Sequence, residues 1–226
     1  MGRYVISIDG ACRRNGKPDC VSSGGVFIQY FNNFGHFERC GIGACYEKAS
    51  TNQRGELHAL LVALNYIAQE TDVQDDIQIV TDSEYLFNAM TKTWFVGWAS
   101  RGWLTASMES VKNADLWMNV SNLYQTLSGR DINYYHIKGH CISFGRVTAD
   151  RLLNLDCTGN LLLQEIYKKF DESVVTKQSL FSAAQKLSAR NNGFLLPEEV
   201  FRNFVVANTM ADAVATKEVD AADARS

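Results

Sequence analysis

The stretch YVISIDGACRRNG, residues 4–16, places an acidic residue at the end of an apolar run. Val5, Ile6 and Ile8 are typical of a buried β-strand, yet Asp9 follows them directly. A carboxylate that faces an apolar interior costs several kcal/mol unless a positive charge compensates it. Either the strand therefore ends at Asp9, or Asp9 has a positively charged partner.

The composition limits the class of protein. The chain has 226 residues, 46% of them hydrophobic, which is enough for one domain of about 150 residues and an extension. No apolar run approaches the roughly 18 to 20 residues that span a bilayer, and no signal peptide is apparent. The six cysteines form no C-x-x-C pair, so we expect reduced thiols in an intracellular, cytoplasmic protein that is not secreted.

The net charge of −3 argues against a protein that binds nucleic acid by charge alone. This net charge is compatible with an acidic site that binds metal ions before the protein binds a polyanion.

Hydrophobic periodicity predicts a mixed α/β protein. The expected strands are residues 3–9, 26–31, 36–47, 76–81 and 132–139, with NNFG as a hairpin turn between the second and third. The expected helices are residues 50–69, a stretch after Asp82, a Trp-rich stretch, 114–127 and 147–167. Ser50, Thr51 or Asn52 can cap the first of these helices.

The last part of the chain is different in kind. Two short amphipathic helices are predicted over residues 179–190 and 197–214, and residues 217–226 are expected to be frayed. We therefore divide the chain into a domain at 1–165 and a helical C-terminal extension at 166–226. Its balanced charges make a cover over the sheet the simplest role, with a DNA contact or a homo-oligomer contact as alternatives.

Four carboxylates stand at strand ends and helix starts: Asp9, Glu56, Asp82 and Asp150. In an α/β fold such positions share one edge of the sheet, so these side chains can converge. Each also has a simpler explanation, because acidic residues favour helix N-termini and Asp82-Ser83 is an ordinary cap sequence. If they converge, they suit Mg²⁺, and two such ions about 4 Å apart support phosphodiester hydrolysis.

Six ordered segments resemble ribonuclease H of the type-1 class between about residues 3 and 156. They are IDGACRRNG, STNQRGELHALLVAL, VTDSEYL, WFVGWASRGWLTA, VKNADLW, and IKGH with ADRL ten residues on. The resemblance implies a five-stranded mixed sheet flanked by helices and an endonuclease that cuts the RNA strand of RNA–DNA hybrids. It implies two Mg²⁺ ions, with Mn²⁺ as a substitute.

The resemblance also implies roles for individual residues. Asp9, Glu56, Asp82 and Asp150 match the catalytic, metal-binding tetrad, and His140 matches a mobile catalytic histidine that helps with water delivery or product release. The positions expected to contact the hybrid are Cys12, Asn15, Asn52 and Gln53 at the ribose 2′-hydroxyl, Thr51 and Asn113 at a DNA phosphate, and Trp94, Arg101, Trp103 and Lys112 in a basic, aromatic handle.

Several features depart from the family pattern. Ala99 and Ser100 stand where many relatives carry lysines, Glu84 where Gln is common and Arg146 where Asn is usual. Two rival functions are a catalytically silent hybrid-binding module and a DNA-junction nuclease or integrase core of the same fold. An intact tetrad argues against the first, and Asn15, Asn52 and the Trp-rich handle argue against the second.

Overall fold

A five-stranded mixed sheet forms the centre of the computed structural model, which describes residues 1–48, 50–140, 167–168 and 198–225. The strand order is β3-β2-β1-β4-β5, with β1, β2 and β3 antiparallel and β4 and β5 parallel to β1. The strands are β1 (Arg3–Arg13), β2 (Val21–Phe31), β3 (Phe37–Lys48), β4 (Asp76–Thr81) and β5 (Ile132–His136). The predicted five-stranded mixed sheet is confirmed.

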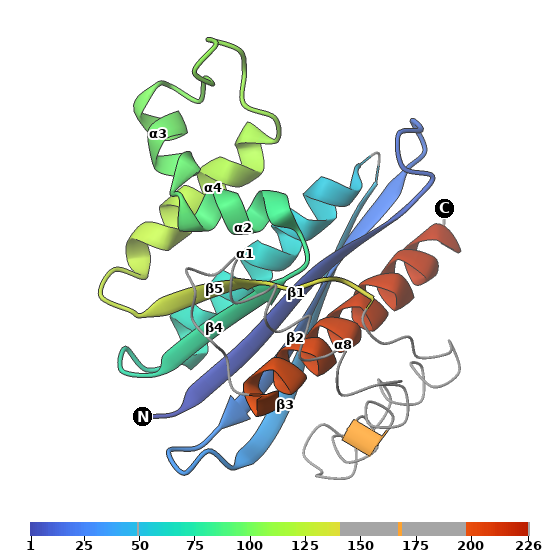
Figure 1. Cartoon of the computed structure of the whole chain (residues 1–226). Helices are drawn as coiled ribbons and strands as arrows, with labels where there is room; N and C mark the ends of the chain where they lie inside the picture. Colours follow the sequence, from blue (N-terminus) through green and yellow to red (C-terminus); the bar gives the residue numbers. More distant parts are fainter. Residues whose placement is uncertain (49, 141–166, 169–197, 226) are drawn as a thin grey trace.

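Helices cover both faces of this sheet (Figure 1). They are α1 (Asn52–Glu70), α2 (Glu84–Thr91), α3 (Trp94–Ser100), α4 (Ala114–Thr126) and α8 (Glu198–Asp223). Helices α1 to α4 lie on one side, where α1 packs on β1, β2 and β3, whereas α8 crosses β1, β2 and β3 on the other side. Thr51 caps α1, since its side chain accepts a hydrogen bond from the Arg54 amide.

Successive side chains of β1 point to opposite faces of the sheet, and helices cover both faces. Tyr4, Ile6 and Ile8 pack in the core on the α1 side, while Val5 packs with Phe204 on the α8 side. A strand buried on both faces has an almost continuous apolar sequence. Asp9 has the same parity as Val5, so its side chain belongs to the face covered by α8.

The first strand is longer than predicted. Pairing with β2 continues from Arg3↔Phe31 to Arg13↔Val21, so the turn expected from residue 10 begins only after Arg13. Asp9 therefore lies within the strand, where only 7% of it is exposed. Of the two explanations for this residue, the ending of the strand is wrong.

The C-terminal end is also more ordered than predicted. Helix α8 continues from Glu198 to Asp223, so the expectation of a frayed segment from residue 217 is wrong for residues up to 223. Arg13 and Arg14 at the end of β1 pair with Asp220 and Asp223, which fixes the last turns of α8. Helix α8 thus covers the second face of the sheet, the simplest of the roles considered for the extension.

Several predicted features lie outside the described residues. These are the helix at 179–190, most of the helix at 147–167, and the division between residues 165 and 166, which stays a prediction. Within the described part of the chain, no helix is long and apolar enough to cross a membrane.

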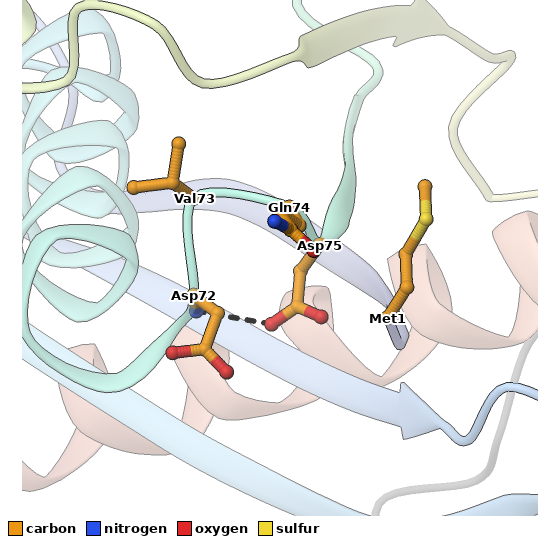
Figure 2. A pocket seen from close by; sticks show the side chains of 5 residues that line it. All are labelled: Met1, Asp72, Val73, Gln74 and Asp75. Atoms are coloured by element: carbon orange, nitrogen blue, oxygen red, sulfur yellow. Dashed lines mark hydrogen bonds between the residues drawn. The ribbon is translucent and has the colours of Figure 1, made fainter.

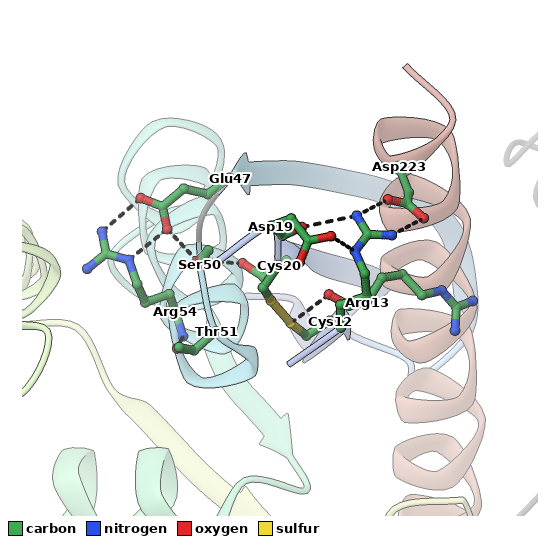
Figure 3. The surroundings of a disulfide bond; sticks show 11 residues. Cys12, Arg13, Asp19, Cys20, Glu47, Ser50, Thr51, Arg54 and Asp223 are labelled. Atoms are coloured by element: carbon green, nitrogen blue, oxygen red, sulfur yellow. Dashed lines mark hydrogen bonds and ion pairs between the residues drawn. A yellow bond between two sulfur atoms is a disulfide. The ribbon is translucent and has the colours of Figure 1, made fainter. Parts of the chain in front are cut away.

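Cys12 and Cys20 form a disulfide, which corrects the expectation of reduced thiols (Figure 3). Because β1 extends to Arg13 and β2 begins at Val21, the connection between them brings the two Cα atoms to 6.8 Å. Ion pairs near this disulfide join Arg14 to Asp19 and Asp223.

Candidate active site

Two acidic residues directly follow the last residue pair of the adjacent parallel strands β1 and β4. Ile8 of β1 pairs with Thr81 of β4, so the residues that follow them, Asp9 and Asp82, are neighbours. Ser83 caps α2 by accepting a hydrogen bond from the Leu86 amide. The explanation of Asp82 as a helix cap is therefore unnecessary.

Glu56 reaches the same edge from α1 on the opposite face of the sheet. The close approach depends on Gly10, because a Cβ atom there would lie 2.6 Å from the Glu56 amide nitrogen and 2.8 Å from its Cγ. Glu56 Oε2 accepts a hydrogen bond of 2.6 Å from the Ser83 hydroxyl, and Oε1 accepts one of 3.1 Å from Asn52 Nδ2. The structure therefore brings Asp9, Glu56 and Asp82 together, as the sequence predicted.

The electrostatics of these carboxylates favour a cation. Burial raises the pKa of Asp9 well above its ordinary value, and the charge of Asp82 raises it further. Burial also raises the pKa values of Glu56 and Asp82. A hydrogen bond of 2.6 Å from the Gly10 amide to Asp9 Oδ1 opposes this shift only in part. Buried carboxylates that repel one another are stabilised by a divalent ion.

These side chains are not preassembled as a metal cage. Among the described residues, no three Asp, Glu, His or Cys side chains are placed to hold an ion as they stand. Glu56 instead uses both oxygens in hydrogen bonds to Ser83 and Asn52. The oxygen donors still fit a hard divalent cation in chemical type and burial.

His140 lies in the turn after β5, as predicted. Its backbone has a φ of 53°, in the left-handed region, and 77% of its side chain is exposed. The preceding Gly139 contacts Asp82, since a Cβ atom at Gly139 would overlap Asp82 Oδ2. An exposed imidazole held beside the carboxylates can carry protons to and from solvent.

One acidic residue at this edge was missed by the sequence prediction. Asp212 of α8 lies with its Oδ2 atom 3.8 Å from His140 Nδ1, and its charge raises the pKa values of both Asp9 and Asp82. The available signal was that Asp212 is the only charged residue in FVVANTMADAVAT, residues 204–216. Asp150 and Arg146 lie outside the described residues.

Four of the residues expected to contact the hybrid lie at the starts of α1 and α4. Thr51 caps α1, Asn52 and Gln53 begin its first turn, and Asn113 precedes α4 with a left-handed φ of 58°. Gln53 Oε1 and Asn113 Nδ2 are buried, and neither has a hydrogen-bond partner among the described residues. Unpaired polar atoms of this kind are rare in folded proteins and suit a ligand.

Cys12 and Asn15 differ in whether their side chains are free to contact a hybrid. The Cys12 sulfur is bonded to Cys20, whereas Asn15 is exposed in the turn between β1 and β2. A contact from the Cys12 thiol would therefore need the disulfide to be reduced.

The aromatic residues of the expected handle are mainly part of the packing. Trp94 and Trp98 are half-buried against the core, with ring centroids 6.1 Å apart. Trp103 has a left-handed φ of 66°, and its amide donates to the Trp98 carbonyl at 2.8 Å. Arg101 and Lys112 are the exposed cations of this segment.

A shallow pocket of about 330 Å³ lies at the opposite end of the parallel strands (Figure 2). It is lined by Met1 and residues 72–75, and Asp75 there accepts hydrogen bonds from the amides of Gly2 and Asp72. These hydrogen bonds give Asp75 a structural role.

Comparisons with known proteins agree with this architecture. The RNase H family model matches residues 2–157. The ribonuclease H of Chromohalobacter salexigens is 38% identical over 154 residues, which cover 68% of this chain and 84% of the relative. That of Polynucleobacter asymbioticus is 35% identical over 150 residues, covering 66% and 86%.

A solved structure, LC9-RNase H1, is described as a type 1 RNase H with the type 2 active-site motif. It matches with a TM-score of 0.52 and 25% identity, over 62% of this chain and 65% of the other.

Fold and site together define a mixed α/β protein with an acidic centre where β1 and β4 meet. The chain belongs to the ribonuclease H family. It is an enzyme of the hydrolase class, an endoribonuclease for RNA–DNA hybrids.

Proposed function

We propose that this chain hydrolyses the RNA strand of RNA–DNA hybrids with two Mg²⁺ ions bound by the carboxylates at the β1–β4 edge. The observation that carries the proposal is the burial of Asp9 beside Asp82 and Glu56, with all three pKa values raised. Bound Mg²⁺ would supply an activated water and charge stabilisation for the leaving oxygen.

Each carboxylate has a distinct position for this task. Asp9 and Asp82, on neighbouring strands, would hold metal centrally. Glu56 would hold metal and orient the attacking water from the α1 side. The sequence assigns the fourth carboxylate to Asp150, and His140 would exchange protons with solvent.

We assign the contacts with the hybrid to the residues that the sequence predicted for them. Asn15, Asn52 and Gln53, with Cys12 in its reduced form, would read the ribose 2′-hydroxyl, which distinguishes RNA from DNA. Thr51 and Asn113 would bind a phosphate of the DNA strand, and Trp94, Arg101, Trp103 and Lys112 would contact its backbone. The unpaired Gln53 Oε1 and Asn113 Nδ2 atoms support these roles.

The test uses the Asp9→Asn variant, which retains the shape of the side chain and the hydrogen bond from Gly10. We expect it to lose cleavage of a labelled RNA–DNA duplex in Mg²⁺ while its circular dichroism spectrum and melting temperature remain those of a folded protein. An all-DNA duplex and an all-DNA junction serve as controls for the rival nucleases. Undiminished cleavage by the variant would refute the role of Asp9.

A further inference from the structure

We propose that Arg54 is a positioning residue for hybrid binding, because it holds the start of α1, with Thr51, against the start of α4, with Asn113. This inference rests on the proposed function, which assigns Thr51 and Asn113 to a phosphate of the DNA strand. Arg54 acts through these two residues and does not itself touch the phosphate.

The guanidinium of Arg54 is bound between two carboxylates from different elements. Its Nε and Nη2 atoms donate to Glu47 of β3 at 2.7 and 2.8 Å. Its Nη1 and Nη2 atoms donate to Asp115 of α4 at 2.9 and 2.7 Å. These hydrogen bonds use four of the five N–H groups of a guanidinium. Two bidentate contacts on one planar group fix both the distance and the angle between the elements that carry them.

Glu47 also fixes the segment that leads into α1. Besides Arg54, it accepts a hydrogen bond of 2.6 Å from the Ser50 hydroxyl (Figure 3). Thr51 follows Ser50 directly, and its side chain accepts a hydrogen bond from the Arg54 amide. The position of Thr51 therefore depends on both residues that Glu47 holds.

Asp115 fixes the other half of the expected phosphate contact. It lies in the first turn of α4, two residues after Asn113. The Asn113 side chain makes no capping hydrogen bond to α4, and its Nδ2 atom has no hydrogen-bond partner among the described residues. The ion pair between Arg54 and Asp115 thus holds the helix end from which this amide group is offered to a ligand.

The charges around Arg54 argue against a direct contact with phosphate. Only 20% of its side chain is exposed, and two carboxylates surround the guanidinium. One positive and two negative charges give Arg54, Glu47 and Asp115 together an excess of one negative charge, which does not attract a polyanion. The contribution of Arg54 to hybrid binding is therefore geometric.

The first test removes Asp115, whose side chain is 61% exposed, so the fold should persist. Because Asp115→Ala removes a negative charge, electrostatics alone predicts tighter binding of a hybrid, whereas loss of positioning predicts weaker binding. We expect the Kd for a labelled RNA–DNA duplex, measured by fluorescence anisotropy in EDTA, to rise about fivefold or more. Glu70→Ala removes an exposed acid at the last residue of α1, and this matched control should bind at least as tightly as the wild type.

The second test keeps the charge of Arg54 and removes its geometry. Arg54→Lys cannot make two bidentate contacts, so its Kd should rise as in Asp115→Ala. In Mg²⁺ its KM should rise while kcat stays within about twofold of the wild type. Arg130→Lys is the matched control, because Arg130 holds Thr71 at the other end of α1 through hydrogen bonds of 2.8 and 2.7 Å. Wild-type affinity in both Arg54→Lys and Asp115→Ala would overturn the inference.

A double-mutant cycle shows whether Arg54 acts through Asn113. Asn113→Ala alone should raise the Kd about tenfold, but by about threefold or less when it is introduced into Arg54→Lys. Fully additive losses would show that the two residues act independently, and would overturn the inference.

A destabilised control separates positioning from a general loss of stability. Ile67→Val shortens a fully buried side chain near the far end of α1, so it should lower the melting temperature and leave the Kd unchanged. An equal rise in Kd for Ile67→Val would assign the effect to stability and overturn the inference. Failure of the wild type to cleave the hybrid in Mg²⁺ would instead refute the proposed function, while the affinities in EDTA would still test the role of Arg54.

Discussion

Asp9 on β1 lies directly opposite Gly25 on β2, and α8 touches the sheet at this pair. The absence of a side chain at Gly25 lets the helix backbone approach the strand that carries the buried carboxylate. The same residue pair thereby connects the packing of α8 to the geometry of the acidic centre.

Gly25→Ala should disturb this contact. The new methyl group would overlap the backbone of Ala211 and Ala215, which cannot move without shifting α8. We expect a loss of about 1–3 kcal/mol in the free energy of unfolding, measured in urea. Gly41→Ala is the matched control in the same sheet, since a Cβ atom there would meet Ile28 at 3.8 Å. Equal stability of the two variants would contradict the described packing of α8 against Gly25.

The disulfide between Cys12 and Cys20 should stabilise the fold. It closes a short loop between β1 and β2, for which the loss of chain entropy in the unfolded state predicts about 2–3 kcal/mol. Urea unfolding with and without reductant measures this difference. The Cys12→Ser/Cys20→Ser variant should lose the response to reductant. A reductant effect that persisted in this variant would assign the effect to other cysteines.

The ion pair between Glu47 and Arg54 predicts a specific pH dependence. Arg54 lowers the pKa of Glu47 from 4.5 to about 2, through hydrogen bonds of 2.7 and 2.8 Å (Figure 3). A lowered carboxyl pKa stabilises the fold above the unfolded value, and this stabilisation is lost as the pH falls toward 2. Because solvent screens this partly exposed pair, we expect Glu47→Gln to cost about 1 kcal/mol at pH 7.

The difference between wild type and Glu47→Gln should shrink as the pH falls from 4.5 toward 2, as followed by urea unfolding at each pH. Arg54→Met should remove most of the effect of Glu47→Gln in a double-mutant cycle. A constant difference across this range would exclude the pair as its source.

The apolar face of α8 should contribute more to stability than its terminal ion pairs. Phe204 is fully buried against the sheet, so Phe204→Ala should cost about 3–5 kcal/mol. Arg14→Ala removes exposed ion pairs with Asp19 and Asp223 and an exposed hydrogen bond to the Asp19 carbonyl, so it should change the melting temperature little. Thermal melts of the two variants decide this, and the reverse order would mean that α8 is held mainly by its end.

Local patterns in the sequence predicted the order of strands and helices in the described part of the chain. The alternation along β1, the helical spacing from Leu57 to Ile67 and the apolar residues before Asp82 each depend on neighbours close in the chain. Asp9, Glu56 and Asp82 were predicted to converge for the same reason, because strand ends and helix starts determine the edge at which a side chain emerges.

Only the tertiary structure decided how far β1 continues, that Cys12 meets Cys20, and that α8 brings Asp212 to the acidic centre. The length of β1 depends on its pairing with β2, and the end of α8 pairs with Arg13 and Arg14, which lie more than two hundred residues away in the chain. The sequence shows which residues favour burial or carry charge. It does not show which distant surfaces fold against each other, because those contacts depend on the packing of the whole chain.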